Sequence, residues 1–536
     1  MTHSLSTPSR RQFLLSASAL AAGSLAASVL PQKLWAASNK TVILAISAEP
    51  PALSALAHTA GPIVSVSAKV TEGLLAYDFD LKPVPQLATA WSVSDDGLTY
   101  DFTLREGVKW HDGQPFTAED VAWSIKTIKE VHPRGRNTFL NLESIEVVDP
   151  LHVRLHLKKP APFLLGALSA TETAIVPKHI YDGTDPLTNP AQGAPIGTGP
   201  FRFKEWAKGS HVAYERNPDY WNPGEPKADQ LIVRFITDPN ARGIALETGE
   251  IHAAPSSPVP LSEVERYRAL PNLAFETRGY EVQNGVVRLE FNLEDPVFKD
   301  IRVRRAVAHA INRDEVLQLA HFGYGVPLYT PVNPNLKNFF APDLKSYPYD
   351  LDAAGKLLDE AGYPADANGE RLRVTLDPML LDDFYKRGGD YIKQALDRIG
   401  IKVDIRNQDY ATYVKRIYTD RDFQFTYNGM SNLFDPTVGV QRLYWSKNFK
   451  RGVPFSNGSG YSNPQVDAWL EEASESTDQA HRGDLWRLIQ AQLQEDVPSI
   501  YTVAPSYHTF ANRALVGHTV DSAGLNANLA QIELTS

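Results

Sequence analysis

Apolar residues recur with the spacing of strands in three stretches of the chain. Residues 41–46 form an unbroken, mostly apolar run, which is typical of a strand buried on both faces. Residues 151–157 instead alternate Leu or Val with His or Arg, and residues 401–405 alternate Ile or Val with Lys or Asp. This period of two predicts strands with one face in the core and the other toward solvent.

Helical spacing follows three capping signals. Thr117 precedes Ala-Glu-Asp, and apolar residues every three or four positions from 121 to 128 predict a helix with that face buried. Asp300 is expected to cap a second helix, and a third is expected over 352–361, ending at Gly362. Because strands and helices alternate through both halves, we expect an α/β or mixed α+β fold.

The chain is too long for one hydrophobic core. It has 536 residues, whereas a domain typically holds about 50 to 250, so we expect at least two domains. Hydrophobic residues make up 43% and charged residues 22%, which is usual for a globular protein. Its 38 prolines and 34 glycines are spread along the chain, which indicates turns rather than one disordered linker.

The first residues have the layout of a cleaved export signal. Residues 9–15, Ser-Arg-Arg-Gln-Phe-Leu-Leu, resemble the twin-arginine signal, and an apolar stretch rich in Ala and Ser continues to residue 30. We therefore expect residues 1–37 to form a signal peptide that is cleaved off, leaving a chain that starts near Ala37 or Ser38 and works in the periplasm. The alternative is a membrane anchor, for which the run is short and only mildly apolar.

The absence of cysteine and the negative net charge exclude some kinds of stabilisation and some kinds of partner. The chain has no cysteine, so it has neither disulfides nor a thiol to carry a lipid, and its stability must come from its core. The net charge is −10 and no basic cluster is present, which argues against nucleic acid or an anionic membrane as a partner.

A long motif connects residues 87–121 with a known family. Residues 87–102 read LATAWSVSDDGLTYDF, and residues 104–121 read LREGVKWHDGQPFTAEDV. Together they resemble the signature of the family 5 extracytoplasmic solute-binding proteins, the peptide/nickel class that feeds ABC importers. Further matches extend over nearly the whole chain after the signal, at residues 197–201, 217–226, 238–251, 291–311, 349–363 and 461–467.

The resemblance implies two lobes that close on a solute like a flytrap. We place the crossing strands near residues 286–292 and 500–510. The first lobe is then 38–287 with the return segment 510–536, and the second lobe is 288–509. A peptide or another small polar solute is expected in the cleft, and an inner-membrane ABC permease is the expected partner of a monomeric chain that needs no cofactor.

Two segments are the expected ligand-binding regions. In relatives, the stretch after the first strand lies along the ligand, which here points to Glu49 and Pro50. The second segment precedes an Asp-Pro pair. Its expected ligand-binding residues are Gly429, Met430, Asn432, Phe434 and Asp435.

Asn432 is the main departure from the family pattern. Peptide binders hold the peptide ammonium group with an Asp at the matching position, and an amide loses the charge-assisted part of that contact. A free peptide N-terminus is therefore a less certain ligand, and opines, sugars or other polar solutes stay open. In the alternative interpretation, the loop is shifted by one residue and another acid serves.

Other chemistry finds little support in the sequence. His111 with Asp112 and Gly113 is explained by a tight turn, and His152 and His156 by a solvated strand face without a third metal ligand. No H-E-x-x-H, G-x-S-x-G or P-loop motif is present, although a Ser-His-Asp set assembled in space stays a second possibility. A sensor or chaperone role on the same fold is a third.

Overall fold

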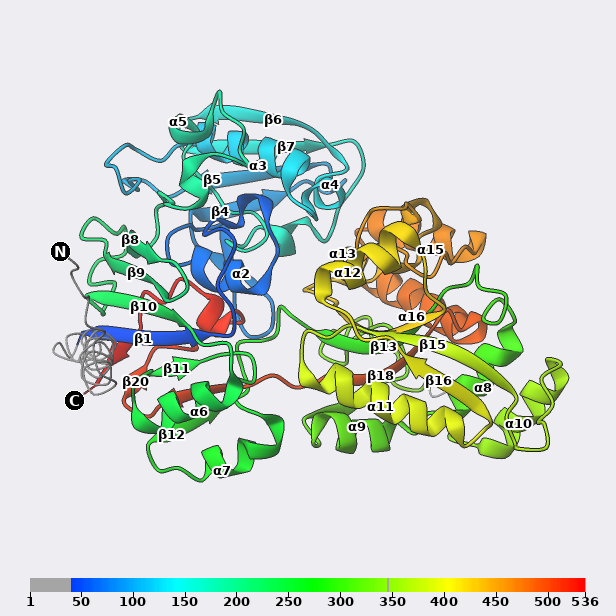
Figure 1. The fold of residues 1–536 in the computed structure, drawn as a ribbon. Helices are drawn as coiled ribbons and strands as arrows, with labels where there is room; N and C mark the ends of the chain where they lie inside the picture. The colour runs from blue at the N-terminus through cyan, green and yellow to red at the C-terminus, as the bar shows by residue number, and fades with distance from the viewer. Residues whose placement is uncertain (1–39, 345–346, 536) are drawn as a thin grey trace, which may run out of the picture.

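The computed structural model describes residues 40–344 and 347–535, and it forms two lobes side by side (Figure 1). The expected export signal and its cleavage point lie outside these residues. The fold is mixed α/β, as predicted. Among the described residues, no helix combines the length and the apolarity needed to cross a membrane.

The first lobe is built on a seven-stranded sheet with the order β12-β19-β11-β1-β10-β9-β8. Its central strand β1 is completely buried, as its apolar run predicted, and it pairs in parallel with β10 and β11. Alternate β1 residues enter two different hydrophobic clusters, one on each face of the sheet. The strands are β1 (Thr41–Ile46), β8 (Phe201–Ala207), β9 (His211–Arg216), β10 (Gln230–Phe235), β11 (Ala253–Ala254), β12 (Leu273–Glu276) and β19 (Thr509–Asn512).

Short helices cover this sheet. Helix α2 (Gly61–Ser67) packs on one face, and α6 (Pro239–Thr248) and α7 (Val264–Arg268) pack on the other. Two small two-stranded antiparallel sheets complete the lobe. They pair β2 (Leu75–Tyr77) with β3 (Pro83–Pro85) and β20 (Leu515–Val516) with β21 (Glu533–Leu534).

A subdomain of the first lobe carries the long motif. It is a four-stranded antiparallel sheet of order β4-β5-β7-β6, against which α3 packs. Thr117 and Asp120 form a capping box at the start of α3, as the capping signal predicted. The elements are β4 (Ala88–Val93), β5 (Thr99–Leu104), α3 (Ala118–Val131), α4 (Gly135–Thr138), β6 (Leu142–Asp149), β7 (His152–Leu157) and α5 (Lys178–Tyr181).

Several residues of the family motifs have a structural role, because they donate hydrogen bonds to the buried carboxylate of Glu72. Its carboxylate accepts hydrogen bonds from Thr198 Oγ1, Tyr220 Oη and Trp221 Nε1, each at 2.9 Å. Asn528 of the return segment donates from 3.4 Å. Burial raises the pKa of Glu72, and these donors oppose that shift. The carboxylate thus joins three distant stretches of the first lobe.

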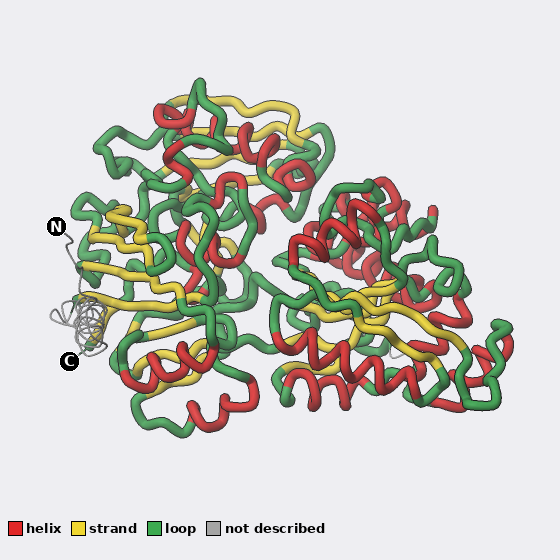
Figure 2. The backbone as a smooth tube through the Cα atoms, in the orientation of Figure 1, coloured by secondary structure: helices red, strands yellow, loops and turns green. Residues whose placement is uncertain are grey.

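The second lobe has a six-stranded sheet with the order β14-β18-β13-β17-β15-β16. Helices lie on both of its faces (Figure 2). The strands are β13 (Gly285–Phe291), β14 (Gly325–Pro327), β15 (Leu372–Pro378), β16 (Ile401–Ile405), β17 (Phe425–Ser431) and β18 (Ser499–Pro505). The helices are α8 (Ile301–Ala310), α9 (Arg313–His321), α10 (Leu351–Glu360), α11 (Asp383–Asp397), α12 (Tyr410–Val414), α13 (Pro436–Gly439), α14 (Gln441–Tyr444), α15 (Pro464–Glu475) and α16 (Gln479–Asp496).

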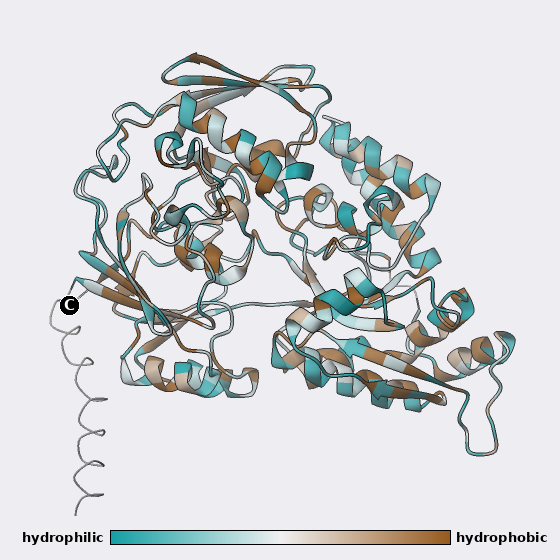
Figure 3. Ribbon diagram, turned by 45° about the horizontal axis from the view of Figure 1, so that its top comes forward, coloured by the Kyte–Doolittle hydropathy of each residue, from teal (hydrophilic) through white to brown (hydrophobic). Residues whose placement is uncertain are grey.

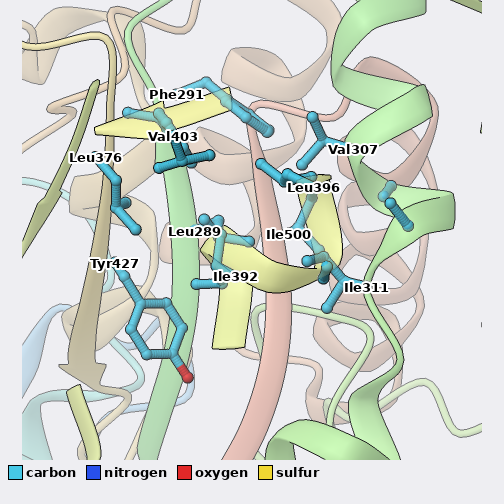
Figure 4. Packing of buried hydrophobic residues seen from close by; sticks show 14 of the residues in the cluster. Leu289, Phe291, Val307, Ile311, Leu376, Ile392, Leu396, Val403, Tyr427 and Ile500 are labelled. Atoms are coloured by element: carbon cyan, nitrogen blue, oxygen red, sulfur yellow. The ribbon is translucent and has the colours of Figure 1, made fainter. Parts of the chain in front are cut away.

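Hydrophobic residues fill both sides of this sheet. Figure 4 shows Leu289 and Phe291 of β13 packed among side chains of α8, α11 and the neighbouring strands. A separate cluster under α14, α15 and α16 fills the opposite face. In Figure 3 the strands of the first-lobe sheet are mostly hydrophobic, whereas the helices carry both colours, as expected for elements that cover a core.

Two short segments connect the lobes. The chain leaves the first sheet after β12, crosses over residues 277–284, and returns over residues 506–508 between β18 and β19. The second crossing lies inside the predicted range 500–510. The first does not lie at 286–292, because β13 pairs along its whole length with β17 of the second lobe. The expected boundary between residues 287 and 288 therefore falls inside a strand of the second sheet.

Candidate functional site

The two lobes touch through the segment that follows β17. Leu433, Phe434 and Val438 pack against the hydrophobic cluster of the first-lobe subdomain. Phe434 lies so close to Gly166 that a Cβ atom on Gly166 would be 2.4 Å from its Cδ2 atom. Figure 1 shows the same approach, with α13 facing the subdomain that contains α4. This interface is where a solute held between the lobes would lie.

Ion pairs and hydrogen bonds join the lobes at both ends of this interface. Lys159 Nζ lies 2.6 Å from Glu475 Oε1 on α15. At the other end, Tyr324 Oη donates to Glu265 Oε1 of α7 from 2.6 Å. The structure therefore has the geometry of a closed form, in which groups from the two lobes lie opposite one another.

Asn432 lies fully buried at the crossing between the lobes. Its backbone N–H donates to the carbonyl of Asn284 from 3.0 Å. Its Oδ1 accepts from the backbone N–H of Asn333 at 2.5 Å, while its Nδ2 has no partner among the described residues. The amide oxygen is thus used to hold a loop of its own lobe.

Asp435, the neighbouring acid, is also engaged within the second lobe. Both of its carboxylate oxygens accept from Arg482 Nη2, at 2.9 and 2.8 Å, and the pair is buried. Asp435 also caps α13 through the N–H of Thr437. Its charge is neutralised inside the protein, so Asp435 does not supply a free carboxylate here.

Gly429 and Met430 pack inside the second lobe. A Cβ atom at Gly429 would be 2.1 Å from Tyr385 Oη, so only glycine fits against that ring. Met430 is 7% exposed and belongs to the hydrophobic cluster under α14 and α16. Among the residues predicted in the second segment, Phe434 is the one that packs against the opposite lobe.

Glu49 is tied to the hairpin between β8 and β9. Its carboxylate accepts from Trp206 Nε1 at 2.9 Å and from the N–H of Gly209 at 3.0 Å. Pro50 is buried immediately beside it. Both residues follow β1, as predicted, but the polar contacts of Glu49 lie within the first lobe.

The sequence analysis missed a group of charged residues at the interface. Arg134, immediately before α4, forms a two-pronged ion pair with Glu172, and the Nε–Oε2 distance is 2.7 Å. His132 is buried next to this pair, and burial lowers its pKa to about 4. Neither of its ring nitrogens has a well-formed hydrogen bond among the described residues, although the backbone of His58 lies near.

Arg442 of α14 completes this group from the second lobe. Its Nε donates to the carbonyl of Gly439 from 3.3 Å. Burial lowers the pKa of Arg442 to about 10, the positive charge of Arg134 lowers it further, and the negative charge of Glu172 raises it. Residues 134, 172 and 442 are far apart in the chain, so no local pattern in the sequence connects them.

Among residues 40–344 and 347–535, no group of three or more His, Asp or Glu side chains is placed to hold a metal ion. His111 bonds through Nε2 to the carbonyl of Gly199 at 2.9 Å, and burial lowers its pKa to about 4. Gly113 has a φ of +89°, which is the turn predicted there. His152 and His156 instead pair with the exposed acids Asp149 and Glu146.

One Ser-His contact bears on the hydrolase alternative. Ser257 Oγ lies 3.2 Å from His508 Nδ1 beside the second crossing. The other ring nitrogen of His508 is buried and has no partner within the described part of the chain. No carboxylate therefore orients this imidazole as in a catalytic triad.

A polar pocket of about 490 Å³ lies at the far end of the second-lobe sheet, away from the crossings. Several of its charged groups are paired with one another, as in Arg421 with Glu294 and Arg406 with Asp422. It faces away from the other lobe, so it does not fit a site that closes between lobes.

Comparisons with known proteins agree with this architecture. The family model described as bacterial extracellular solute-binding proteins, family 5 Middle, matches residues 82–451. The glutathione-binding protein GsiB of Escherichia coli strain K12 is 28% identical over 465 residues, covering 84% of this chain and 86% of that protein.

Solved structures show the same fold. NikZ from Campylobacter jejuni, in complex with Ni(L-His), superposes with a TM-score of 0.81 at 24% identity over 92% of this chain and 100% of that one. The oligopeptide-binding protein AppA from Bacillus subtilis, with a nonapeptide, gives 0.80 at 26% identity over 92% and 99%. DppA from Helicobacter pylori, with the peptide STSA, gives 0.79 at 25% identity over 92% and 98%.

Proposed function

Because the chain belongs to family 5 of the bacterial extracellular solute-binding proteins, we propose that it is the periplasmic substrate-binding component of an ABC importer. It captures a peptide or a peptide-like polar solute between its lobes and delivers it to a permease in the inner membrane. Its relatives in the comparisons are binding proteins, and we extend that to this chain as a carrier that performs no catalysis.

The observation that carries this proposal is the way the lobes are joined. Each lobe has its own sheet and its own hydrophobic clusters, and of the residues that the structure describes only 277–284 and 506–508 cross between them. Two rigid bodies on two short crossings can rotate as a hinge, with the solute buried where Phe434 meets the first lobe. One solute molecule per chain is expected, because a single chain contains both walls of the site and acts as a monomer.

The class of solute rests on two lines of support. The named ligands of GsiB, AppA and DppA are glutathione, a nonapeptide and a short peptide, which favours a peptide-like solute here. Asn432 and Asp435 argue against recognition of a free ammonium group in the usual manner, since neither offers an unpaired carboxylate. A non-peptide polar solute, such as an opine or a sugar, is the second candidate.

The test is to identify the solute that co-purifies with the protein. The mature chain is isolated from periplasm without dialysis, denatured, and its released small molecules are analysed by mass spectrometry. We expect one solute per chain, and the emptied protein should regain it with a thermal stability that rises with the logarithm of solute concentration. Scattering should show a more compact particle with solute bound.

A hydrolysis panel of peptides and esters separates this function from an enzyme. Stoichiometric binding without turnover supports the carrier. Turnover that is lost in Ser257→Ala would instead support a hydrolase and contradict the proposal.

A further inference from the structure

Within the part of the chain that the structure describes, no carboxylate forms an ion pair with Arg442. Its Nε bonds weakly to the carbonyl of Gly439, three residues earlier, and its two terminal nitrogens have no hydrogen-bond or ion-pair partner among the described residues. Arginine is rarely buried unless it is paired, because removing its charge from water is unfavourable. The fully buried arginines of the second lobe are all bonded. Arg288 pairs with Glu290 and Arg482 with Asp435. Arg304 and Arg313 donate to backbone carbonyls, whereas Arg442 is partly buried and its terminal nitrogens lack such partners among the described residues.

The position of Arg442 directs this unpaired charge toward the first lobe. It follows α13, whose Val438 packs in the cluster of the first-lobe subdomain. Across the interface lie Arg134 and Glu172, and the charges of both act on Arg442. Glu172 cannot serve as a full partner, because both of its oxygens are already held by Arg134.

Two further polar groups near this point also lack partners. Tyr418 Oη is buried without a hydrogen bond among the described residues, and Tyr418 lies close enough to Arg442 to raise the pKa of that arginine. His132, whose ring nitrogens lack a well-formed hydrogen bond among the described residues, lies close enough to Arg134 and Glu172 for both charges to act on its pKa. Unpaired donors from both lobes thus gather at one place in the interface, which is typical of a site that a ligand completes.

The charges at this place do not cancel. Arg134 and Arg442 contribute two positive charges, Glu172 contributes one negative charge, and His132 is neutral because burial lowers its pKa. One positive charge is left over in a poorly hydrated interface. The planar guanidinium group of Arg442 presents parallel N–H donors whose spacing matches a carboxylate.

We infer that Arg442 binds a carboxylate group of the solute, which is held between Arg442 of the second lobe and the Arg134–Glu172 pair of the first. This inference rests on the proposed function and specifies its solute as one that carries at least one carboxylate. A bound carboxylate would also favour closure of the lobes. Without it the positive charges of Arg134 and Arg442 repel each other when the lobes meet, and the negative charge between them removes that repulsion.

Matched pairs of acids and amides test the inference. The probes are the peptide Ser-Thr-Ser-Ala and its C-terminal amide, glutathione and its glycine amide, and the co-purified solute with its methyl ester. Binding is measured by calorimetry on the emptied protein. We expect blocking of the relevant carboxylate to weaken binding about 10- to 100-fold, the loss of a charge-assisted hydrogen bond.

Arg442→Gln is the variant, and Arg451→Gln is its control, since Arg451 is an exposed arginine of the same lobe. In Arg442→Gln the acid should bind as weakly as the amide, while in Arg451→Gln the preference for the acid is retained. The emptied Arg442→Gln protein should melt at or above the wild-type temperature, because an unpaired and partly buried charge has been removed. A purely structural arginine would show the opposite.

The outcomes separate this inference from the function on which it rests. If a solute binds but has no carboxylate, or if Arg442→Gln keeps the wild-type preference for acids, the inference is overturned and the carrier function stands. If the protein releases no solute on denaturation and binds none of the probes, the proposed function is contradicted as well.

Discussion

Gly166 of the first lobe lies directly under the ring of Phe434 from the second, with no room for a Cβ atom between them. This contact exists because the chain places α13 against the subdomain that carries the long sequence motif. A glycine there lets the two lobes approach closely, and the ring covers the interface. The contact between the lobes at this point thus depends on a missing side chain in one lobe and an aromatic side chain in the other.

Gly166→Ala should hinder closure without disturbing either lobe. Forcing a methyl group into this contact is expected to cost about 1–3 kcal/mol in the closed state, which corresponds to about 5- to 150-fold weaker solute binding. Calorimetry measures the affinity, and scattering with saturating solute measures the closed fraction. Adding Phe434→Ala should restore part of the affinity, because it removes the colliding ring. A double variant that binds no better than Gly166→Ala alone would refute this account of the contact.

Asn432→Asp should destabilise the protein rather than create an ammonium site. Asn432 is fully buried, and its Oδ1 already accepts from the N–H of Asn333. An uncompensated carboxylate there should lower the free energy of unfolding by at least about 2 kcal/mol. Denaturant unfolding measures this loss, with Asn368→Asp in an exposed turn as the control. If Asn432→Asp instead gained affinity for peptides with a free N-terminus and kept its stability, the residue would face the ligand.

Lys69 should make stability depend on alkaline pH. Its Nζ is buried and donates to the carbonyls of Leu525 and Ala527, at 2.7 and 2.5 Å. Burial lowers its pKa from 10.5 to about 7, with the negative charge of Asp521 opposing that shift. The folded chain therefore binds fewer protons than the unfolded chain between these values, so its free energy of unfolding rises with pH across that window.

The comparison is between wild type and Lys69→Met. From about pH 7 to pH 10 the stability of the wild type should gain on the variant, with a slope approaching about 1.4 kcal/mol per pH unit. Lys126→Met, on the exposed side of α3, should show no such trend. A difference between wild type and Lys69→Met that is constant over this range would mean that Lys69 keeps its ordinary pKa.

Export should depend on the arginine pair at the start of the chain. Replacing Arg10 and Arg11 together by Lys should keep the precursor in the cytoplasm, because Lys lacks the planar donor array of Arg. Cell fractionation measures this, and Lys33→Arg, which leaves the pair intact, is the control. In the exported protein the first residue should be Ala37 or Ser38. Normal periplasmic delivery of the double variant would exclude the twin-arginine route.

Local elements were determined by the sequence itself. The apolar run of β1, the alternation in β7 and β16, and the caps Thr117 and Asp300 all appear in the structure as predicted. These features depend on residues a few positions apart, whose spacing sets which face of a strand or helix is apolar. The long motif at residues 87–121 also predicted the two lobes, because a match over so many positions identifies the family and thereby its fold.

The position of the crossing and the use of the site residues were decided by the tertiary structure. Residues 285–291 read equally well as a connecting strand or as a strand of the second sheet, and only their pairing with β17 places them in the second lobe. Glu49, Asn432 and Asp435 are polar residues in the predicted segments, yet each is held by a partner in its own lobe. Spacing along a chain does not reveal whether a polar atom already has a partner.

Arg442 shows the same limit most clearly. In the sequence it is an arginine between Gln441 and Leu443, with nothing to distinguish it from the other basic residues. Its unpaired charge becomes evident only when the lobes bring it opposite Arg134 and Glu172, about 300 and 270 residues away along the chain. The electrostatic free energy of a charge depends on distance through space and on the water that folding removes, and neither is encoded in the order of residues.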